Sequence, residues 1–96
     1  MTPEGRIKVQ VDHVLAMYEG DVWVFKPVQT GYGKRALDYL GCVKGHTFAI
    51  ETKRPGKEAT LMQRACARDI HNAGGTVWFI SESATVELFR QWLEAR

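Results

Sequence analysis

The chain has 96 residues, of which 45% are hydrophobic and 25% charged, and its formal net charge at pH 7 is +2. A chain of this length buries about 65% of its unfolded surface, enough for one core, so we expect a single domain over residues 1–96. Apolar runs fall short of the roughly 20 residues that span a bilayer, and the first residues lack the apolar stretch of a signal peptide. We therefore expect a cytoplasmic protein with no membrane partner. The mildly basic charge permits nucleic-acid binding without requiring it.

Hydrophobic periodicity and turn residues divide the chain into helices and strands. In chain order, the expected elements are a helix at about 3–18, strands at 22–25, 36–43 and 46–53, a helix at 60–73, a strand at 76–81 and a last helix that Ser83 caps. Between the first two strands, residues 29–35 are typical of a flexible loop. The order α-β-β-β-α-β-α predicts an α/β chain of the α+β kind, with a mixed sheet and helices packed against it.

The two later helices carry apolar residues that we expect to be buried. On the helix at 60–73 they form the stripe Met62, Cys66, Ile70 and Ala73. On the last helix they surround more than one face: Val86, Leu88, Phe89, Trp92 and Leu93. These residues either build the core or bury one side of the helix against a partner, and both explanations stay open. Cys42 and Cys66 belong to no CxxC pair, so we expect buried thiols rather than a disulfide or metal site.

One tight turn is expected to bring two carboxylates face to face. Asp38 lies six residues before Lys44 and Glu51 lies six residues after Gly45. If Lys44-Gly45 is a two-residue turn, the two acids stand opposite each other with Cβ atoms about 4.5–5.5 Å apart. They repel unless a divalent cation such as Mg²⁺ compensates, and strand alternation puts Lys53 on the face of Glu51. The alternative is a strand-edge Asp38 beside a solvated Glu-x-Lys pair.

These residues, with their spacing along nearly the whole chain, resemble the VRR-NUC branch of the PD-(D/E)XK nuclease superfamily. In that family an Asp precedes a hairpin, the next strand carries Glu-x-Lys, the following helix carries a Gln, and a Gly-Gly turn leads into an apolar strand. The matching positions are Asp38, Glu51, Lys53, Gln63 and Gly74-Gly75, and Glu4 best matches a Glu of the first helix. Leu37 departs from the family's usual Pro. The resemblance implies a restriction-endonuclease-like αβββαβα core.

The resemblance also implies a Mg²⁺- or Mn²⁺-dependent endonuclease that hydrolyses phosphodiester bonds in DNA. Asp38 and Glu51 would hold the ion together with the backbone carbonyl of Thr52, and Glu4 is a further candidate ligand. Lys53 would position or help deprotonate the attacking water and steady charge on the phosphate. Stand-alone members of this family are similar to phage-type homodimers that cut branched DNA such as four-way (Holliday) junctions. We therefore expect a homodimer, acting in the cytoplasm of a bacterial host if the chain is phage-encoded.

Two of these residues have a second interpretation that involves no catalysis. Gln63 follows Thr60 by three residues, which is the spacing of a capping box. Glu4 in the first turn of a helix is favoured by the helix dipole alone. Both interpretations stay open for each residue. The alternative functions for the whole chain are a non-catalytic nucleic-acid-binding module or accessory subunit with a nuclease fold, or a nuclease for flaps, linear ends or RNA.

Basic residues around the predicted site are the expected DNA contacts. They lie in the loop before Asp38, directly after Lys53, and along one side of the second helix. In chain order they are Lys34, Arg35, Arg54, Lys57, Arg64, Arg68 and, in line with the last two, His71. Such groups hold phosphates and give salt-dependent binding with little sequence readout. The alternative is that the helix stripe is only a solvated face.

Overall fold

The computed structural model describes residues 1–27 and 37–96. In chain order its elements are α1 (Pro3–Met17), β1 (Val22–Phe25), β2 (Tyr39–Val43), β3 (His46–Thr52), α2 (Leu61–Asn72), β4 (Thr76–Ile80) and α3 (Ser83–Glu94). The strands form one sheet in the order β1-β2-β3-β4. The first three strands pair antiparallel, and β4 is parallel to β3. The predicted α-β-β-β-α-β-α order and the mixed sheet are thus confirmed.

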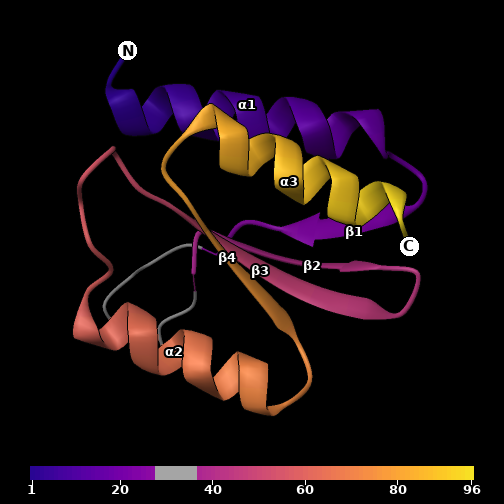
Figure 1. Ribbon diagram of the computed structural model, residues 1–96. Coiled ribbons are helices and arrows are strands. Elements are labelled where there is room, and N and C mark those ends of the chain that lie inside the picture. The colour runs from indigo at the N-terminus through magenta and orange to yellow at the C-terminus, as the bar shows by residue number, and fades with distance from the viewer. Residues whose placement is uncertain (28–36) are drawn as a thin grey trace.

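The main core lies between the sheet and the helices α1 and α3, which cover the same face (Figure 1). Alternation along β3 turns Phe48 and Ile50 to this side, where both are fully buried. The Phe48 and Phe89 rings meet at a centroid distance of 5.4 Å. Burying an aromatic or branched side chain stabilises a fold by about 1.5–3 kcal/mol, so this cluster fixes α3 on the sheet.

The apolar residues of α3 belong to the chain's own core. Val86, Phe89 and Leu93 are buried, and Trp92 packs edge-on against Phe48. Only Leu88, among the five apolar residues named for this helix, is largely exposed, at 54%. The core explanation therefore holds, and these buried residues supply no surface for a partner. The expected cap is wrong by one residue: Glu82 is the N-cap, and Ser83 is the first residue of the helix.

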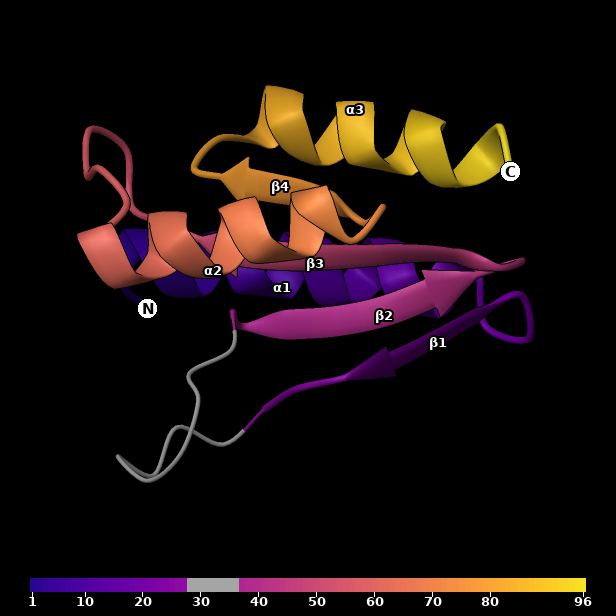
Figure 2. The same ribbon diagram turned by 90° about the horizontal axis from the view of Figure 1, so that it is seen from below.

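The expected burial of the α2 stripe is wrong. The helix α2 has no buried residue, and Met62 is 60% exposed. Cys66 and Ile70 are half-buried, and Ala73 is exposed. The reason is that α2 lies over the β3–β4 half of its face, and none of the described helices covers β1 and β2 on that side (Figure 2). Cys42 and Cys66 are not joined in a disulfide, and both are half-buried rather than buried as expected.

The hairpin has the register that its turn predicts. Tyr39 faces Ile50 and Val43 faces His46, so Lys44 and Gly45 are the two turn residues. Both have positive φ, at 46° and 84°, as a tight hairpin turn requires. The strand β2 begins at Tyr39, later than the expected start at position 36, which lies outside the described residues. No helix in the described part of the chain is long and apolar enough to cross a bilayer.

Candidate active site

The predicted site residues come from the ends of several elements that meet at one edge of the molecule. There β3 ends, and the helices α1 and α2 begin (Figure 1). Asp38 precedes β2, Glu51 lies in β3, and Lys53 follows that strand directly. Gln63 lies in the first turn of α2, and Glu4 in the first turn of α1. Segments far apart in the sequence thus supply side chains to the same end of the sheet.

Asp38 and Glu51 are joined by hydrogen bonds between one residue's side chain and the other strand's backbone. The Asp38 N–H donates to Glu51 Oε1 at 3.2 Å. In return, Asp38 Oδ2 accepts the Thr52 N–H at 3.0 Å and the Thr52 hydroxyl at 2.7 Å. Because the Asp38 side chain takes the Thr52 N–H, the backbone ladder does not continue past Tyr39. The two acids therefore face each other at the open end of the hairpin, as the register predicts.

The Glu51 carboxylate also contacts the side chains of Lys53 and Gln63. Its Oε2 atom accepts from Gln63 Nε2 at 2.9 Å and lies 4.0 Å from Lys53 Nζ. Glu51 and Lys53 are each only 7% exposed. Gln63 meanwhile completes the capping box, since its Oε1 accepts the Thr60 N–H at 2.9 Å and its own N–H donates to Thr60 Oγ1. The two interpretations of Gln63 are therefore compatible, because its amide has one end for the cap and one for Glu51.

Burial raises the pKa of Glu51 to about 7, and the negative charge of Asp38 adds to this effect. The hydrogen bond from the Asp38 N–H and the Lys53 ammonium oppose the shift, and Glu4 adds to it from α1. Glu4 itself forms an ion pair with Lys8 at 3.6 Å. The acids at this end of the sheet thus carry more negative charge than the nearby Lys53 compensates, which is the condition that a bound cation relieves.

The donor set fits a hard divalent cation that keeps part of its hydration. Mg²⁺ and Mn²⁺ take carboxylate oxygens and commonly retain waters or bind substrate phosphates. Asp38 and Glu51 supply two carboxylates on neighbouring strands. Within residues 1–27 and 37–96, no three Asp, Glu, His or Cys side chains form a group able to hold a metal. Glu4 raises the pKa of Glu51 electrostatically, and its place among the metal ligands stays a prediction.

Sequence reasoning missed the role of the Thr52 side chain. The family resemblance implies only a backbone carbonyl from Thr52, and strand alternation puts its side chain on the other face from Glu51 and Lys53. The structure shows its hydroxyl and its N–H both bound to Asp38. The available signal was the hydroxyl itself, since a polar group on the buried face of a strand requires a partner.

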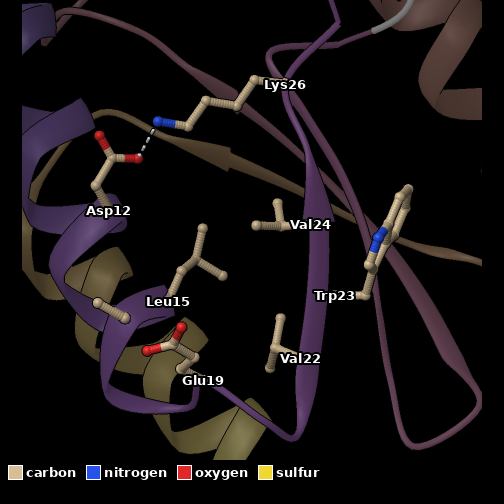
Figure 3. Close-up of a pocket in the computed structure, with 8 residues that line it drawn as sticks. Asp12, Leu15, Glu19, Val22, Trp23, Val24 and Lys26 are labelled. Carbon is tan, nitrogen blue, oxygen red and sulfur yellow. Dashed lines mark ion pairs between the residues drawn. The ribbon is translucent and has the colours of Figure 1, made fainter.

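A separate cleft between α1 and β1 contains none of the predicted site residues. Figure 3 shows Val22 and Val24 turned towards Leu15, with Trp23 turned away. Asp12 and Lys26 form an ion pair at its rim at 2.9 Å. Asp12 also accepts the Tyr39 hydroxyl at 2.7 Å; burial, chiefly, and this bond raise the pKa of Tyr39. These pairings attach α1 to β1 and β2.

The basic residues that were predicted as DNA contacts and that the structure describes are all exposed. Arg54 and Lys57 lie in the turn after Lys53, while Arg64, Arg68 and His71 lie on α2. Arg68 contacts Asp69 at 3.5 Å. Lys34 and Arg35 lie outside the described residues. Exposed guanidinium and ammonium groups match a surface that binds a polyanion, and a solvated face is the alternative interpretation.

Comparison with known proteins shows the fold. No family model and no curated protein matches the sequence. A solved structure described as a VRR_NUC domain matches the chain with a TM-score of 0.75 and 19% sequence identity, over 95% of this chain and 97% of that one. Likeness at this identity establishes the fold rather than the activity. The chain therefore has the fold of a VRR-NUC domain, as the Asp38, Glu51-x-Lys53 and Gln63 pattern predicted.

Proposed function

We propose that the chain is a Mg²⁺- or Mn²⁺-dependent endonuclease that hydrolyses phosphodiester bonds in DNA. The observation that carries the proposal is the surroundings of one buried carboxylate. Glu51 accepts hydrogen bonds from Asp38 and Gln63 and lies 4.0 Å from the Lys53 ammonium. Two facing acids repel each other and destabilise the fold, and the pKa of one of them, Glu51, is raised to about 7. Such perturbed carboxylates are typical of functional sites. The VRR-NUC fold, by analogy, also favours a nuclease.

Asp38 and Glu51 are the residues that would hold the cation. When bound, the ion would lower the pKa of a water molecule and stabilise charge on the scissile phosphate. Hydrogen bonds from Gln63 Nε2 and from the Asp38 N–H fix the two Glu51 oxygens, which prepares that carboxylate for an ion. The peptide between Thr52 and Lys53 would add the Thr52 carbonyl as a further oxygen donor.

Lys53 would act on the water and the phosphate rather than on the metal. Its side chain is largely buried and its backbone N–H donates to the Ile80 carbonyl at 2.9 Å, so its position is set by the sheet. A buried ammonium group supplies charge that needs little reorganisation when negative charge develops on the phosphate. It would also orient the attacking water for displacement in line with the leaving oxygen.

DNA is the proposed polymer because cations surround the site. Arg54 and Lys57 are exposed in the turn after Lys53, and Arg64 lies on the helix of Gln63. Lysine and arginine side chains of this kind contact phosphates, so we expect recognition of the DNA backbone rather than of base sequence. We propose branched DNA, such as four-way junctions, as the substrate, in line with the family resemblance.

A cleavage panel tests the function. Purified protein is incubated with Mg²⁺ or Mn²⁺ and with single-stranded, duplex, flap and four-way-junction DNA, with an RNA duplex alongside. Glu51→Gln is expected to abolish cleavage, whereas Glu58→Gln, in the loop before α2, should cleave as the unmodified protein does. Equal cleavage by the Glu51→Gln protein would overturn the assignment.

The rival function is a nucleic-acid-binding module that does not cleave. Calorimetric titration with Mn²⁺ separates the two, because an enzyme should bind the ion and lose that binding in Asp38→Ala. A protein that binds junction DNA but neither binds Mn²⁺ nor cleaves is the non-catalytic module. No observation on the described residues favours this rival over the nuclease.

We propose further that two copies act together, through the half of the sheet that no described helix covers. Since the apolar residues of α3 are mostly internal, the exposed aromatic surface that remains includes Trp23 and Phe25, at 62% and 51% exposure. Their rings stack at 6.4 Å on the edge strand β1. Light scattering should report a dimer for the unmodified protein and for Leu88→Glu on α3, but a monomer for Trp23→Glu. A monomeric unmodified protein would remove this proposal.

A further inference from the structure

Thr52 occupies the middle position of the Glu51-Thr52-Lys53 segment, and its side chain is fully buried at the end of β3. Its Oγ1 donates to Asp38 Oδ2 at 2.7 Å, and its N–H donates to the same oxygen at 3.0 Å. We propose that the Thr52 hydroxyl is a positioning group that fixes the Asp38 carboxylate in one orientation for a divalent cation.

The chemistry of the hydroxyl supports this role over a plain packing role. A buried hydroxyl costs free energy unless it is hydrogen-bonded, and a valine of the same shape would fill this position without that cost. The acceptor that Thr52 finds is a carboxylate oxygen, so the bond is charge-assisted and short. Thr52 therefore directs its one donor to a site residue rather than to the core around it.

The two oxygens of Asp38 differ in the hydrogen bonds that they accept from the described residues. Two donors on Oδ2 occupy the lone pairs of that atom. Among the hydrogen bonds of the described residues, Asp38 Oδ1 accepts none. Because the Asp38 N–H is itself held by Glu51 Oε1, both the backbone and the side chain of Asp38 are fixed. The second oxygen is thus presented in a defined direction before any ion arrives.

The effect on the Asp38 side chain follows from the geometry alone, whereas the effect on metal affinity rests on the function proposed above. Groups that orient a metal ligand without touching the metal typically change affinity by about 10- to 100-fold when they are removed. We expect Thr52→Val to weaken Mn²⁺ binding by about that factor. Thr52→Ser, which keeps the hydroxyl, should stay close to the unmodified protein.

The experiment compares Thr52→Val and Thr52→Ser with the control Thr47→Val, which removes an exposed hydroxyl at the other end of β3. In the metal-free proteins, three-bond Hα–Hβ couplings of Asp38 report its χ1 rotamer. Calorimetry reports the Mn²⁺ affinity. We expect a single rotamer in the unmodified protein, Thr52→Ser and Thr47→Val, and averaged couplings with weaker Mn²⁺ binding in Thr52→Val. Thr52→Ala provides a second hydroxyl-free variant.

A Thr52→Val protein whose Asp38 keeps one rotamer overturns the inference, whatever its metal affinity. So does a Thr52→Ser protein that behaves like Thr52→Val, because the hydroxyl would then not be the operative group. If the unmodified protein binds no Mn²⁺, the proposed nuclease function fails, while the rotamer measurement still decides the role of Thr52. The two failures are thus distinguishable.

Discussion

Asp38 and Glu51 hold each other across the β2–β3 hairpin through a reciprocal pair of hydrogen bonds. The Asp38 N–H donates to Glu51 Oε1 at 3.2 Å, and the N–H of the residue after Glu51 donates to Asp38 Oδ2 at 3.0 Å. Each acid thereby stabilises the strand end that carries the other. The arrangement also brings two negative charges together in a largely buried site, where Lys53 compensates only part of them. The hairpin is held together by groups that repel each other in the absence of a cation.

Replacement of Asp38 by asparagine should remove the negative charge of the side chain and keep its shape. The amide oxygen can still accept from Thr52, so the fold should persist. We expect Mn²⁺ affinity to fall by at least about 100-fold and cleavage to fall with it, because hard cations prefer carboxylate ligands. Calorimetry and single-turnover cleavage measure the two effects. Asp69→Asn, an exposed aspartate on α2, is the control. Unchanged Mn²⁺ affinity in Asp38→Asn would contradict the metal site.

Replacement of Lys53 by methionine should slow DNA cleavage without weakening Mn²⁺ binding. Methionine fills much of the space of the lysine stem, and the position is only 7% exposed, so the stability should change little. We expect cleavage to fall by about 10²- to 10³-fold, since a fixed charge beside the phosphate is lost. Mn²⁺ affinity should be unchanged or tighter, because a repelling positive charge is gone. Lys44→Met, at an exposed position in the hairpin turn, serves as control, and equal losses of affinity and cleavage would refute the separation.

The metal-free protein should become less stable as the pH rises. The pKa of Glu51 is about 7 in the folded chain against an ordinary value of 4.5, chiefly because of burial. Between these values the folded chain holds a proton that the unfolded chain has released, so the free energy of unfolding falls as pH rises from about 4.5 to about 7 and then levels off. The loss is on the order of 3 kcal/mol at most.

Thermal melts of the metal-free protein between about pH 4.5 and pH 8 measure this loss, and Glu51→Gln supplies the matched control. That variant should lack this component of the pH dependence, and Mn²⁺ at the upper end of the range should restore stability to the unmodified protein but not to the variant. Parallel pH profiles for the two proteins would show that Glu51 is not the group responsible.

The site could be predicted from the sequence to the extent that local rules determine it. The two-residue turn determines which residues face each other, and strand alternation puts Glu51 and Lys53 on one face. The Thr-x-x-Gln spacing predicted the capping box at Gln63. These features depend on backbone periodicity and turn geometry, which a single segment specifies. For this reason the register of the hairpin and the facing positions of its two acids could be predicted from the sequence.

The errors have a common physical cause, because they concern contacts between segments. The exposure of Met62 depends on which half of the sheet α2 covers, and helical spacing alone does not determine this. The late start of β2 and the hydrogen bonds of Thr52 have one cause. The side chain of Asp38, rather than a backbone carbonyl of β2, accepts the Thr52 N–H and hydroxyl. The electrostatic effect of Glu4 on Glu51 likewise depends on how α1 packs, and its place among the metal ligands stays a prediction.

Arg64 and Arg68 should contribute to DNA affinity through charge alone. Both lie on α2, the helix that carries Gln63. We expect the double variant Arg64→Gln, Arg68→Gln to bind junction and duplex DNA several-fold more weakly. The slope of log affinity against log salt should fall by about one for each phosphate that the variant no longer neutralises.

Fluorescence anisotropy at several salt concentrations measures both the affinity and this slope. Arg90→Gln on α3, where Arg90 is paired with Glu87, should leave the slope unaltered. An unchanged slope in the double variant would identify α2 as a merely solvated face.

Gly41, in the middle of β2, should tolerate no side chain, and its substitution should weaken the hairpin that carries the site. A Cβ atom there would lie 2.4 Å from Phe48 Cζ and 2.7 Å from the Trp23 carbonyl oxygen. The ring can shift, but the carbonyl belongs to the backbone of β1 and cannot move without disturbing the β1–β2 pairing. We expect Gly41→Ala to cost about 1–3 kcal/mol, and the melting temperature should fall by roughly 4–8 °C per kcal/mol. Gly5→Ala is the matched control, because its Cβ would meet only the side chains of Thr2 and Met1, at 3.1 and 3.2 Å, and a helical alanine is favoured. Equal melting temperatures for the two variants would show that β1 and β2 adapt more readily than this close backbone approach suggests.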